Sequence, residues 1–174
     1  MIISVADLKK QINCGTAADE QIAIKLEAIE AVIRAYTNNN FQLRGVRFTG
    51  NSDGLNVYGT PTHIFGVGDT IQISASLVND GLYQVTHVQP TFLQVDKPLK
   101  TCEKNLVTKV NYPADVVQCA VDLYKWKQMM GDKVGIKSET ISRHSVTYED
   151  SATLFMGYPV CILNGLNLHK KARC

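Results

Sequence analysis

Histidine and cysteine are the residues of this chain that could hold a metal ion or act as nucleophiles. The histidines are His63, His87, His144 and His169, and the cysteines are Cys14, Cys102, Cys119, Cys161 and Cys174. No two histidines have the spacing of a zinc site, and no two cysteines form a C-x-x-C pair. An odd number of widely spaced cysteines is typical of free thiols in a reducing compartment. The spacing therefore predicts neither a metal site nor a disulfide framework.

Three short stretches contain residue types used in phosphate binding or acid–base catalysis. The sequence GVG at 66–68 resembles half of a phosphate-binding loop, but it precedes a predicted strand, so no helix N-terminus is available for a phosphate. The sequences SRH at 142–144 and ED at 149–150 are runs of neighbours, and neighbouring side chains on a strand point to opposite faces. We therefore expect no catalytic, metal-binding or cofactor-binding residues, and no cofactor.

Composition and charge restrict the class of protein further. The 174 residues are 45% hydrophobic and 20% charged, which suits one domain, or a small domain that carries a sizeable insertion. The net charge of +2 does not indicate a basic domain that binds nucleic acid by neutralising phosphates. The N-terminus does not resemble a signal peptide, and no segment approaches the roughly 18 apolar residues of a membrane span. We expect a soluble protein inside the cell.

Two capping boxes predict helices near the N-terminus. Ser4 and Asp7 predict a short helix from Val5 to about Ile12, and Thr16 and Asp19 predict a longer one to about Asn38. The longer helix has an apolar stripe made of Ile22, Leu26, Ile29, Ile33 and Tyr36. Its opposite side holds Ile24, Ala28, Ala31 and Ala35. This second face has two interpretations: alanine is a good helix former, or the face packs against another subunit.

Short β-branched runs with turn signals occupy residues 45–110. We predict four or five strands there, including residues 92–96 and 106–110 as separate strands, with a turn at 79–81 and a loop at 50–59. Such strands suggest a small antiparallel β-barrel or sandwich. The predicted fold class is α+β: a small helical bundle of about four helices plus a hairpin, formed by 1–44 and 111–174, with the β domain inserted at 45–110.

The last third of the chain returns to helical patterns. Pro113 suits the first turn of a helix whose buried stripe contains Val116, Cys119 and Leu123. A polar hairpin is predicted from 136 to 148. Tyr158 and Pro159 then open a short helix, followed by an extended basic tail.

The order of these elements resembles the phage head–tail connector family, whose members are also called adaptor or head-completion proteins. The stretch GIKSETI at 135–141, followed by SVTY at 145–148, carries the most specific part of the likeness. Tyr158 and Pro159 before a short helix and a basic tail add to it. The resemblance spans both helical parts, and the β insertion matches less closely.

The resemblance implies a non-enzymatic structural role. Members of the family form a ring beneath the portal protein, extend the DNA channel, and receive a stopper or tail-completion protein. For this chain the resemblance implies a ring, which is a dodecamer in the virion. DNA passes through the ring without specific binding. The resemblance implies no contact with a membrane. The expected locations are the host cytoplasm during assembly and the head–tail interface of the virion. The candidate portal contacts are Leu166, Leu168, Lys170, Lys171 and Arg173. The candidate subunit or stopper contacts are Ile24, Ala28, Ala31, Ala35, Ser138, Thr140 and Arg143.

Two alternatives stay open. The first is a binding module whose β domain recognises a small ligand, glycan or peptide, and it predicts that residues 45–110 fold and bind alone. The second is an enzyme, and it predicts that His87, His144 or Cys102 clusters with carboxylates in one pocket.

Overall fold

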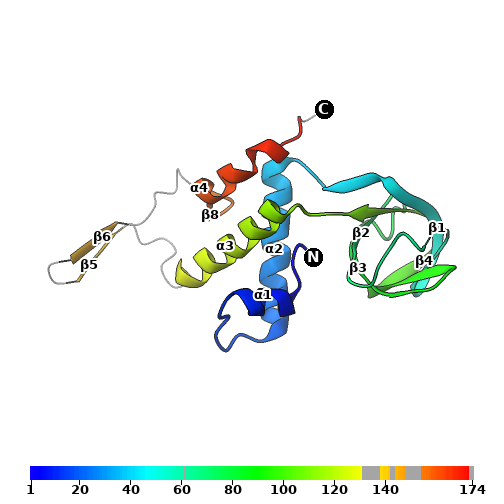
Figure 1. The fold of residues 1–174 in the computed structure, drawn as a ribbon, viewed down its shortest axis with the longest axis horizontal. Helices are drawn as coiled ribbons and strands as arrows, with labels where there is room; N and C mark the ends of the chain where they lie inside the picture. The colour runs from blue at the N-terminus through cyan, green and yellow to red at the C-terminus, as the bar shows by residue number, and fades with distance from the viewer. Residues whose placement is uncertain (61, 131–137, 142–143, 148–153, 173–174) are drawn as a thin grey trace. The chain divides into compact units, whose positions relative to one another are not determined.

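The computed structural model describes residues 1–60, 62–130, 138–141, 144–147 and 154–172. The chain is of mixed α+β class and divides into two compact units (Figure 1). Met1 and residues 40–112 form the first, here called the β unit, and residues 2–39 and 113–174 form the second, here called the helical unit. No helix in the described part of the chain is both long and apolar enough to cross a membrane.

The first two helices of the helical unit start differently. Helix α1 (Val5–Gln11) has the predicted capping box, because Ser4 Oγ accepts a hydrogen bond from Asp7 N at 3.0 Å and donates one to the Asp7 carboxylate. The second predicted capping box is wrong. Helix α2 (Asp19–Thr37) begins after Ala18 without a side-chain cap, and the carboxylate of Asp19 pairs with Lys9 instead.

Helix α2 ends where the asparagine run predicts. Asn38 adopts the left-handed conformation, with a φ of 47°, and its backbone N–H closes the last turn on Arg34. Four of the five residues in the predicted apolar stripe, Ile22, Leu26, Ile29 and Ile33, are completely buried. Only Tyr36, in the last turn, is partly exposed.

Helix α3 (Ala114–Met130) begins directly after Pro113 and lies across α2 (Figure 1). Its buried face contains the predicted Val116, Cys119, Ala120, Leu123 and Tyr124. The strands β5 (Ser138–Ile141) and β6 (His144–Thr147) pair antiparallel, in agreement with the predicted hairpin. A second short pair, β7 (Leu154–Phe155) with β8 (Tyr158–Pro159), leads into α4 (Val160–Leu163) and the 3-10 helix η2 (Asn164–His169).

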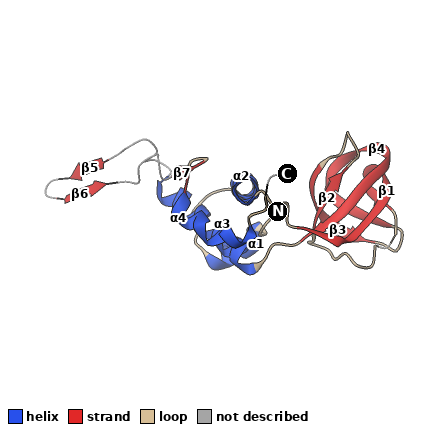
Figure 2. Ribbon diagram, turned by 90° about the horizontal axis from the view of Figure 1, so that it is seen from above, coloured by secondary structure: helices blue, strands red, loops and turns tan. Residues whose placement is uncertain are grey.

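The β unit contains an antiparallel sheet of β1 (Gln42–Tyr58), β2 (Thr70–Ser74), β3 (Gly81–Val88) and β4 (Phe92–Val110). Among the described residues the strand order is β1-β4-β2-β3, and β4 also pairs with β3. The sheet is strongly curved (Figure 2) but it is not closed into a barrel, which corrects that part of the prediction. One buried cluster is formed by nine side chains of the sheet and by Phe65 from the β1–β2 connection: Phe48, Val57, Phe65, Ile71, Ile73, Val85, Leu93, Val95, Leu99 and Val107.

Two local predictions in this unit are wrong for a common reason. Residues 50–58, predicted to be loop, belong to β1, and the two strands predicted at 92–96 and 106–110 are parts of β4. The two long strands pair from Gln42↔Val110 to Tyr58↔Phe92, with register shifts around Gly50, Ser52 and Gly54. Glycine and other small polar residues mark irregular strand pairing here and not a loop.

The chain passes between the units close to the expected positions. The unit boundaries lie at 39/40 and 112/113, whereas the sequence places them at 44/45 and 110/111. Asn111 N donates to Phe41 O at 2.9 Å, and the rings of Phe41 and Tyr112 are 5.1 Å apart. These contacts assign the flanking residues to the β unit.

Candidate functional site

The C-terminal segment, residues 160–172, is packed onto the helical unit through two leucines. Leu163 and Leu166 are 0% and 1% exposed. In a 3-10 helix residues i and i+3 lie on the same side, so these two side chains point together into the core. Cys119 Sγ on α3 donates to Ile162 O at 3.7 Å, and burial, followed by the charges of Asp122 and Asp115, raises the pKa of Cys119 to about 12. This thiol is therefore protonated and unsuited to nucleophilic chemistry near neutral pH.

From Asn164 onward the segment is also held by polar contacts with the end of α2. Tyr36 Oη donates to Asn164 Oδ1 at 2.9 Å. Lys171 N donates to Thr37 O at 2.8 Å. The other contacts are Tyr36 Oη to Asn167 Oδ1, Asn39 Nδ2 to His169 O, and Asn38 Nδ2 to Lys171 O and Ala172 O. The expected extended tail is thus folded back as far as Ala172.

A charged contact joins the same segment to the start of α3. His169 Nε2 lies 2.6 Å from Asp115 Oδ2. This hydrogen bond is the main cause of the lowered pKa of Asp115. The Asp115 side chain is about half exposed, so the pair positions the segment more than it stabilises the fold.

We predict that His169→Ala raises the pKa of Asp115 toward its ordinary value near 3.8. A carboxylate whose pKa is lowered by folding contributes stability above its unfolded pKa, and that contribution is lost as the pH falls through the folded pKa. The contribution of Asp115 should therefore disappear below about pH 4, and it should be smaller in the variant. Carboxyl-carbon NMR titration measures the shift. Asp7, whose pKa is lowered by Lys10, is the internal control and should not change.

The five candidate portal residues have different environments. Leu168 is 94% exposed, whereas Leu166 is buried in its own unit and is not available to a partner in this conformation. Lys170 is exposed, with its Nζ 3.8 Å from the centre of the Tyr36 ring. Lys171 is exposed as well, and Arg173 lies outside the described residues.

The candidate subunit contacts on α2 form one surface. Ile24 is 67% exposed, and Ala28, Ala31 and Ala35 are exposed too. The candidates from the hairpin are only partly placed. Ser138 and Thr140 lie on β5 opposite Thr147 and Ser145, and Arg143 is outside the described residues, as are residues 142, 149 and 150.

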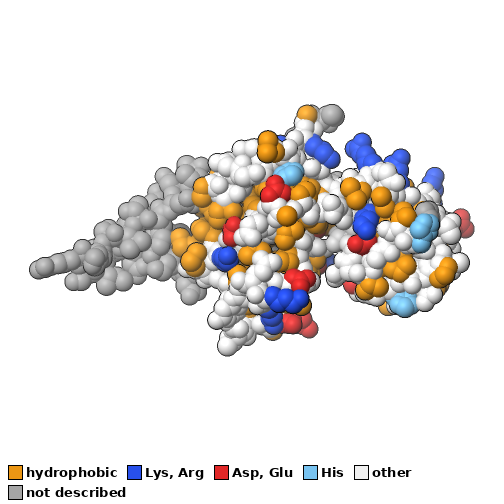
Figure 3. Space-filling view, in the orientation of Figure 1, with side chains coloured by type: hydrophobic (Ala, Val, Ile, Leu, Met, Phe, Trp, Pro, Cys, Tyr) orange, Lys and Arg blue, Asp and Glu red, His pale blue; other side chains and the backbone are white. Residues whose placement is uncertain are grey.

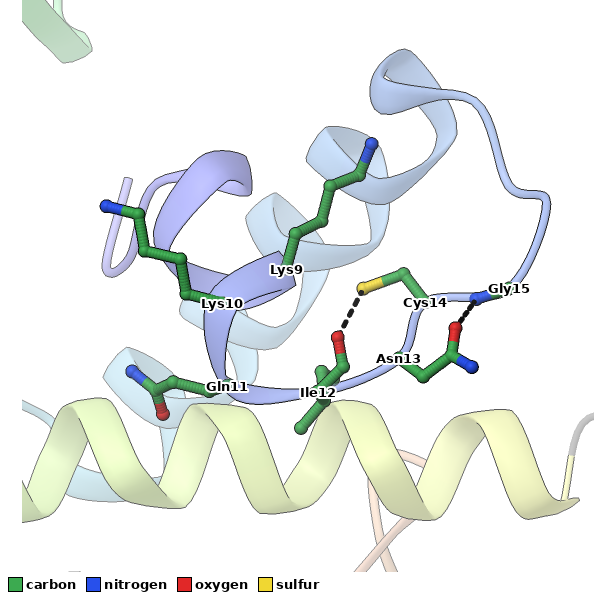
Figure 4. A pocket seen from close by; sticks show the side chains of 7 residues that line it. All are labelled: Lys9, Lys10, Gln11, Ile12, Asn13, Cys14 and Gly15. Atoms are coloured by element: carbon green, nitrogen blue, oxygen red, sulfur yellow. Dashed lines mark hydrogen bonds between the residues drawn. The ribbon is translucent and has the colours of Figure 1, made fainter.

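One hollow of the helical unit is formed by one continuous stretch, from Lys9 to Gly15 (Figure 4). Both of its lysines already have acidic partners, since Lys9 pairs with Asp19 and Lys10 with Asp7. Its two marked hydrogen bonds join Cys14 to Ile12 O and Gly15 N to Asn13 Oδ1, within the same loop. The side chain of Ile12 points toward α3 (Figure 4). The hollow is an open surface of the α1–α2 connection with no charge available to a ligand.

The structure gives hydrogen-bond partners to His87 and Cys102, two of the three residues named for the enzyme alternative. His87 contacts Gln89 at 2.7 Å, and Cys102 Sγ donates to Ser76 O and Lys104 O. No group of three or more His, Cys, Asp or Glu side chains that could hold a metal occurs in the described part of the chain. The structure thus gives His87 and Cys102 neutral polar partners, while the side chain of His144 is not among those described.

Comparison with known proteins identifies no family for this chain. No protein-family model matches the chain, and no curated protein matches its sequence.

Sequence reasoning missed the residues that hold the C-terminal segment. The sequence places Tyr36 in the apolar stripe of the long helix and the asparagines at its end, and it gives no role to Asp115. A run of three asparagines is longer than a helix stop requires, and that excess was the one available signal.

Proposed function

We propose that this protein is a head–tail connector of a tailed phage or prophage. In this proposal the helical unit is the connector domain, a small helical bundle, and the β unit is an insertion into it. The connector forms a ring under the portal protein, extends the DNA channel, and receives the stopper or tail-completion protein. It acts in the host cytoplasm during assembly and then at the head–tail interface.

The C-terminal segment is the observation that carries the proposal. Two buried leucines anchor its start, and beyond them exposed polar contacts hold Leu168, Lys170 and Lys171 at the surface of the helical unit. Exposed hydrogen bonds contribute little net stability, because water replaces them readily. A portal surface can therefore take over these contacts while Leu163 and Leu166 keep the segment attached.

A second surface supports ring formation. The face of α2 with Ile24 and three alanines is exposed on the isolated chain, and small side chains permit close approach of a neighbouring helix. The net charge of +2 also suits a channel through which DNA must slide without binding. Both observations are compatible with a ring.

The test is co-sedimentation of the purified protein with DNA-filled, tailless capsids, followed by electron microscopy of the pelleted particles. A ring of added density at one vertex would establish the connector role. If the protein stays in the supernatant, the connector role is lost, and ligand screening of the β unit would follow, as the binding-module alternative requires.

We predict that deletion of residues 168–174 abolishes docking on capsids and leaves a folded protein. The deletion removes Leu168 and the lysines but keeps the buried Leu163 and Leu166, so thermal unfolding should change little. Leu168→Asp is the finer variant, because a side chain that is 94% exposed has no role in the core. Met156→Asp, at a side chain 62% exposed in the same unit, is its matched control and should dock normally. Normal docking of the truncated protein would contradict the role of this segment.

A further inference from the structure

Three neighbouring strands of the β unit present a row of aromatic and amide side chains on one face. β4 lies between β1 and β3, and its Gln94 is opposite Asn56 of β1 on one side and His87 of β3 on the other. In the next row, Phe92 of β4 is opposite Tyr58 of β1. Residues opposite each other in an antiparallel pair have neighbouring side chains on the same face. These side chains together are here called the outer face.

The alternation of buried and exposed residues shows that this face is turned away from the core. Val57 of β1 and Leu93 and Val95 of β4 are at most 1% exposed and belong to the buried cluster of the β unit. Successive side chains of a strand point to opposite faces, so the outer-face residues of β1 and β4, which alternate with these three, point outward. His87 of β3 is exposed as well.

Two aromatic rings lie at the centre of the outer face. The ring centres of Tyr58 and Phe92 are 5.6 Å apart and the rings are tilted by 51°. Both side chains are partly exposed, so each ring is restrained by its partner and still reaches the solvent. Groups that are already restrained lose little conformational entropy when a ligand binds to them.

Hydrogen-bonding groups without formal charge surround the two rings. Gln89 Nε2 lies 2.7 Å from His87 Nε2, and Asn56 Nδ2 donates to Tyr58 Oη at 3.3 Å. Asn56 Oδ1 is buried and accepts no hydrogen bond from the described part of the chain. A buried acceptor without a donor is costly, and one long bond holds this amide in place. A ligand that supplies a donor is therefore favoured once the amide turns toward it.

Charge limits the class of ligand. The segments 54–68 and 81–95, which supply the whole outer face, contain no lysine, arginine, aspartate or glutamate, although 20% of the chain is charged. The next outward position on β4 is Asp96, whose carboxylate already accepts a hydrogen bond from Gln84 N. Figure 3 shows uncharged surface over much of the β unit, with most of its visible lysine and arginine side chains along the upper side. The outer face offers no counter-charge to an ion, so it fits a neutral ligand.

Hydrogen bonding distinguishes among the ligands that stack on aromatic rings. Single-stranded nucleic acid stacks on such rings but also requires a positively charged groove, and the outer face has no lysine or arginine. A proline-rich peptide docks on aromatic side chains too, but proline has no N–H to donate to Asn56 Oδ1. Both edges of β4 are paired here, so an extended peptide has no free edge of β4 to join.

We propose that the outer face binds a neutral oligosaccharide. A pyranose ring has C–H groups that pack on the rings of Tyr58 and Phe92. Its hydroxyls each donate and accept, and so pair with the amides of Asn56 and Gln94 and with the imidazole of His87. A chain of β-linked glucose units is flat and matches the face of a sheet. This binding is a further function of the β unit, and it does not depend on the connector role.

The test is a heteronuclear NMR titration of the full chain, without capsids, with cellohexaose and with chitohexaose. The backbone signals of the outer face and the side-chain amide signals of Asn56 and Gln94 should shift, and those of the helical unit should not. Sugar concentrations up to about 10 mM detect the weak binding expected of an open surface.

Two variants connect the binding to the outer face. Phe92→Ala removes one ring and should weaken binding at least about 10-fold. Gln94→Ala removes one amide and should weaken it several-fold. Both side chains are partly exposed, so the variants should keep their fold, which the dispersion of the same spectra verifies. Val67→Ala, at a side chain 69% exposed in the same unit, is the control and should bind like the wild type.

The proposal is overturned if neither sugar shifts the signals of the outer face, or if folded Gln94→Ala and Phe92→Ala proteins bind like the wild type. Shifts caused by a polyproline peptide and by neither sugar would overturn it as well and would assign the face to a peptide. Failure of the connector role is measured separately. A protein that docks on capsids but binds neither sugar keeps that role and loses this site, and a protein that binds sugar without docking shows the reverse.

Discussion

Replacing Gly50 with alanine should abolish cooperative unfolding of the β unit or lower its melting temperature by more than about 15 °C. A Cβ at Gly50 would lie 1.8 Å from the carbonyl oxygen of Tyr58 and 2.9 Å from its carbonyl carbon. Both are backbone atoms of the same strand, so no side-chain rotation relieves the overlap. The Gly50 carbonyl also accepts from the buried Asn105 side chain, so any shift of this backbone disturbs that hydrogen bond as well.

The expected magnitude is at the upper end for single substitutions. Losses above about 4 kcal/mol are exceptional and follow from mechanisms such as backbone strain or a disrupted buried network. In a domain of this size each kcal/mol shifts the melting temperature by roughly 4–8 °C. Circular dichroism at about 218 nm follows the unfolding of the sheet during heating.

Gly45→Ala is the matched control for this substitution. Gly45 lies on the same strand, β1, and a Cβ there meets no atom within 4 Å. Its φ is not in the left-handed region, so alanine introduces no strain there. The control should unfold within about 1 kcal/mol of the wild type. Equal melting temperatures for the two variants would show that β1 does not approach itself at Gly50.

Leu123→Asp should unfold the helical unit. Leu123 is 0% exposed on α3, in a unit whose completely buried side chains include Leu8, Ile22 and Ile29. An unpaired carboxylate in such a core costs several kcal/mol, which approaches the whole stability of a domain, about 5–15 kcal/mol. Far-ultraviolet circular dichroism should show loss of helix, and thermal scans should lack the transition of this unit.

Met129→Asp is the control on the same helix. Met129 is 70% exposed, so the same chemical change there leaves the core intact, and the melting temperature should stay close to that of the wild type. A soluble Leu123→Asp protein with an unchanged melting temperature would contradict the packing of α3 described above.

Two of the candidate portal contacts have different environments that the structure shows and the sequence does not. Leu166 and Leu168 are two residues apart in one basic tail. The resemblance read from the sequence makes both of them candidate portal contacts. The structure buries Leu166 beside Leu163 through the period of a 3-10 helix, and that same period leaves Leu168 exposed. A basic tail in the sequence predicts an extended segment, and a helical period does not apply to an extended segment.

The sequence by itself determined the local elements of this protein. The capping box of α1, the apolar stripe of α2, the stop at Asn38 and the start of α3 after Pro113 each depend on contacts within one or two helical turns. Such contacts are present whatever the rest of the chain does, so the pattern of residues is enough to predict them.

Only the tertiary structure decided the features that depend on distant partners. The strand at 50–58 exists because residues 92–105 pair with it. The C-terminal segment folds back because Tyr36, Asn38 and Asn39 contact it from more than 100 positions away in the chain. The β2–β3 loop is likewise held by other strands, because Asn79 Nδ2 donates to Ser52 Oγ and to Asn105 Oδ1. Glycines and asparagines in these stretches have the same local preferences in a turn, a bulge or a buried network. Which of these structures forms depends on the distant residues that the fold brings into contact with them.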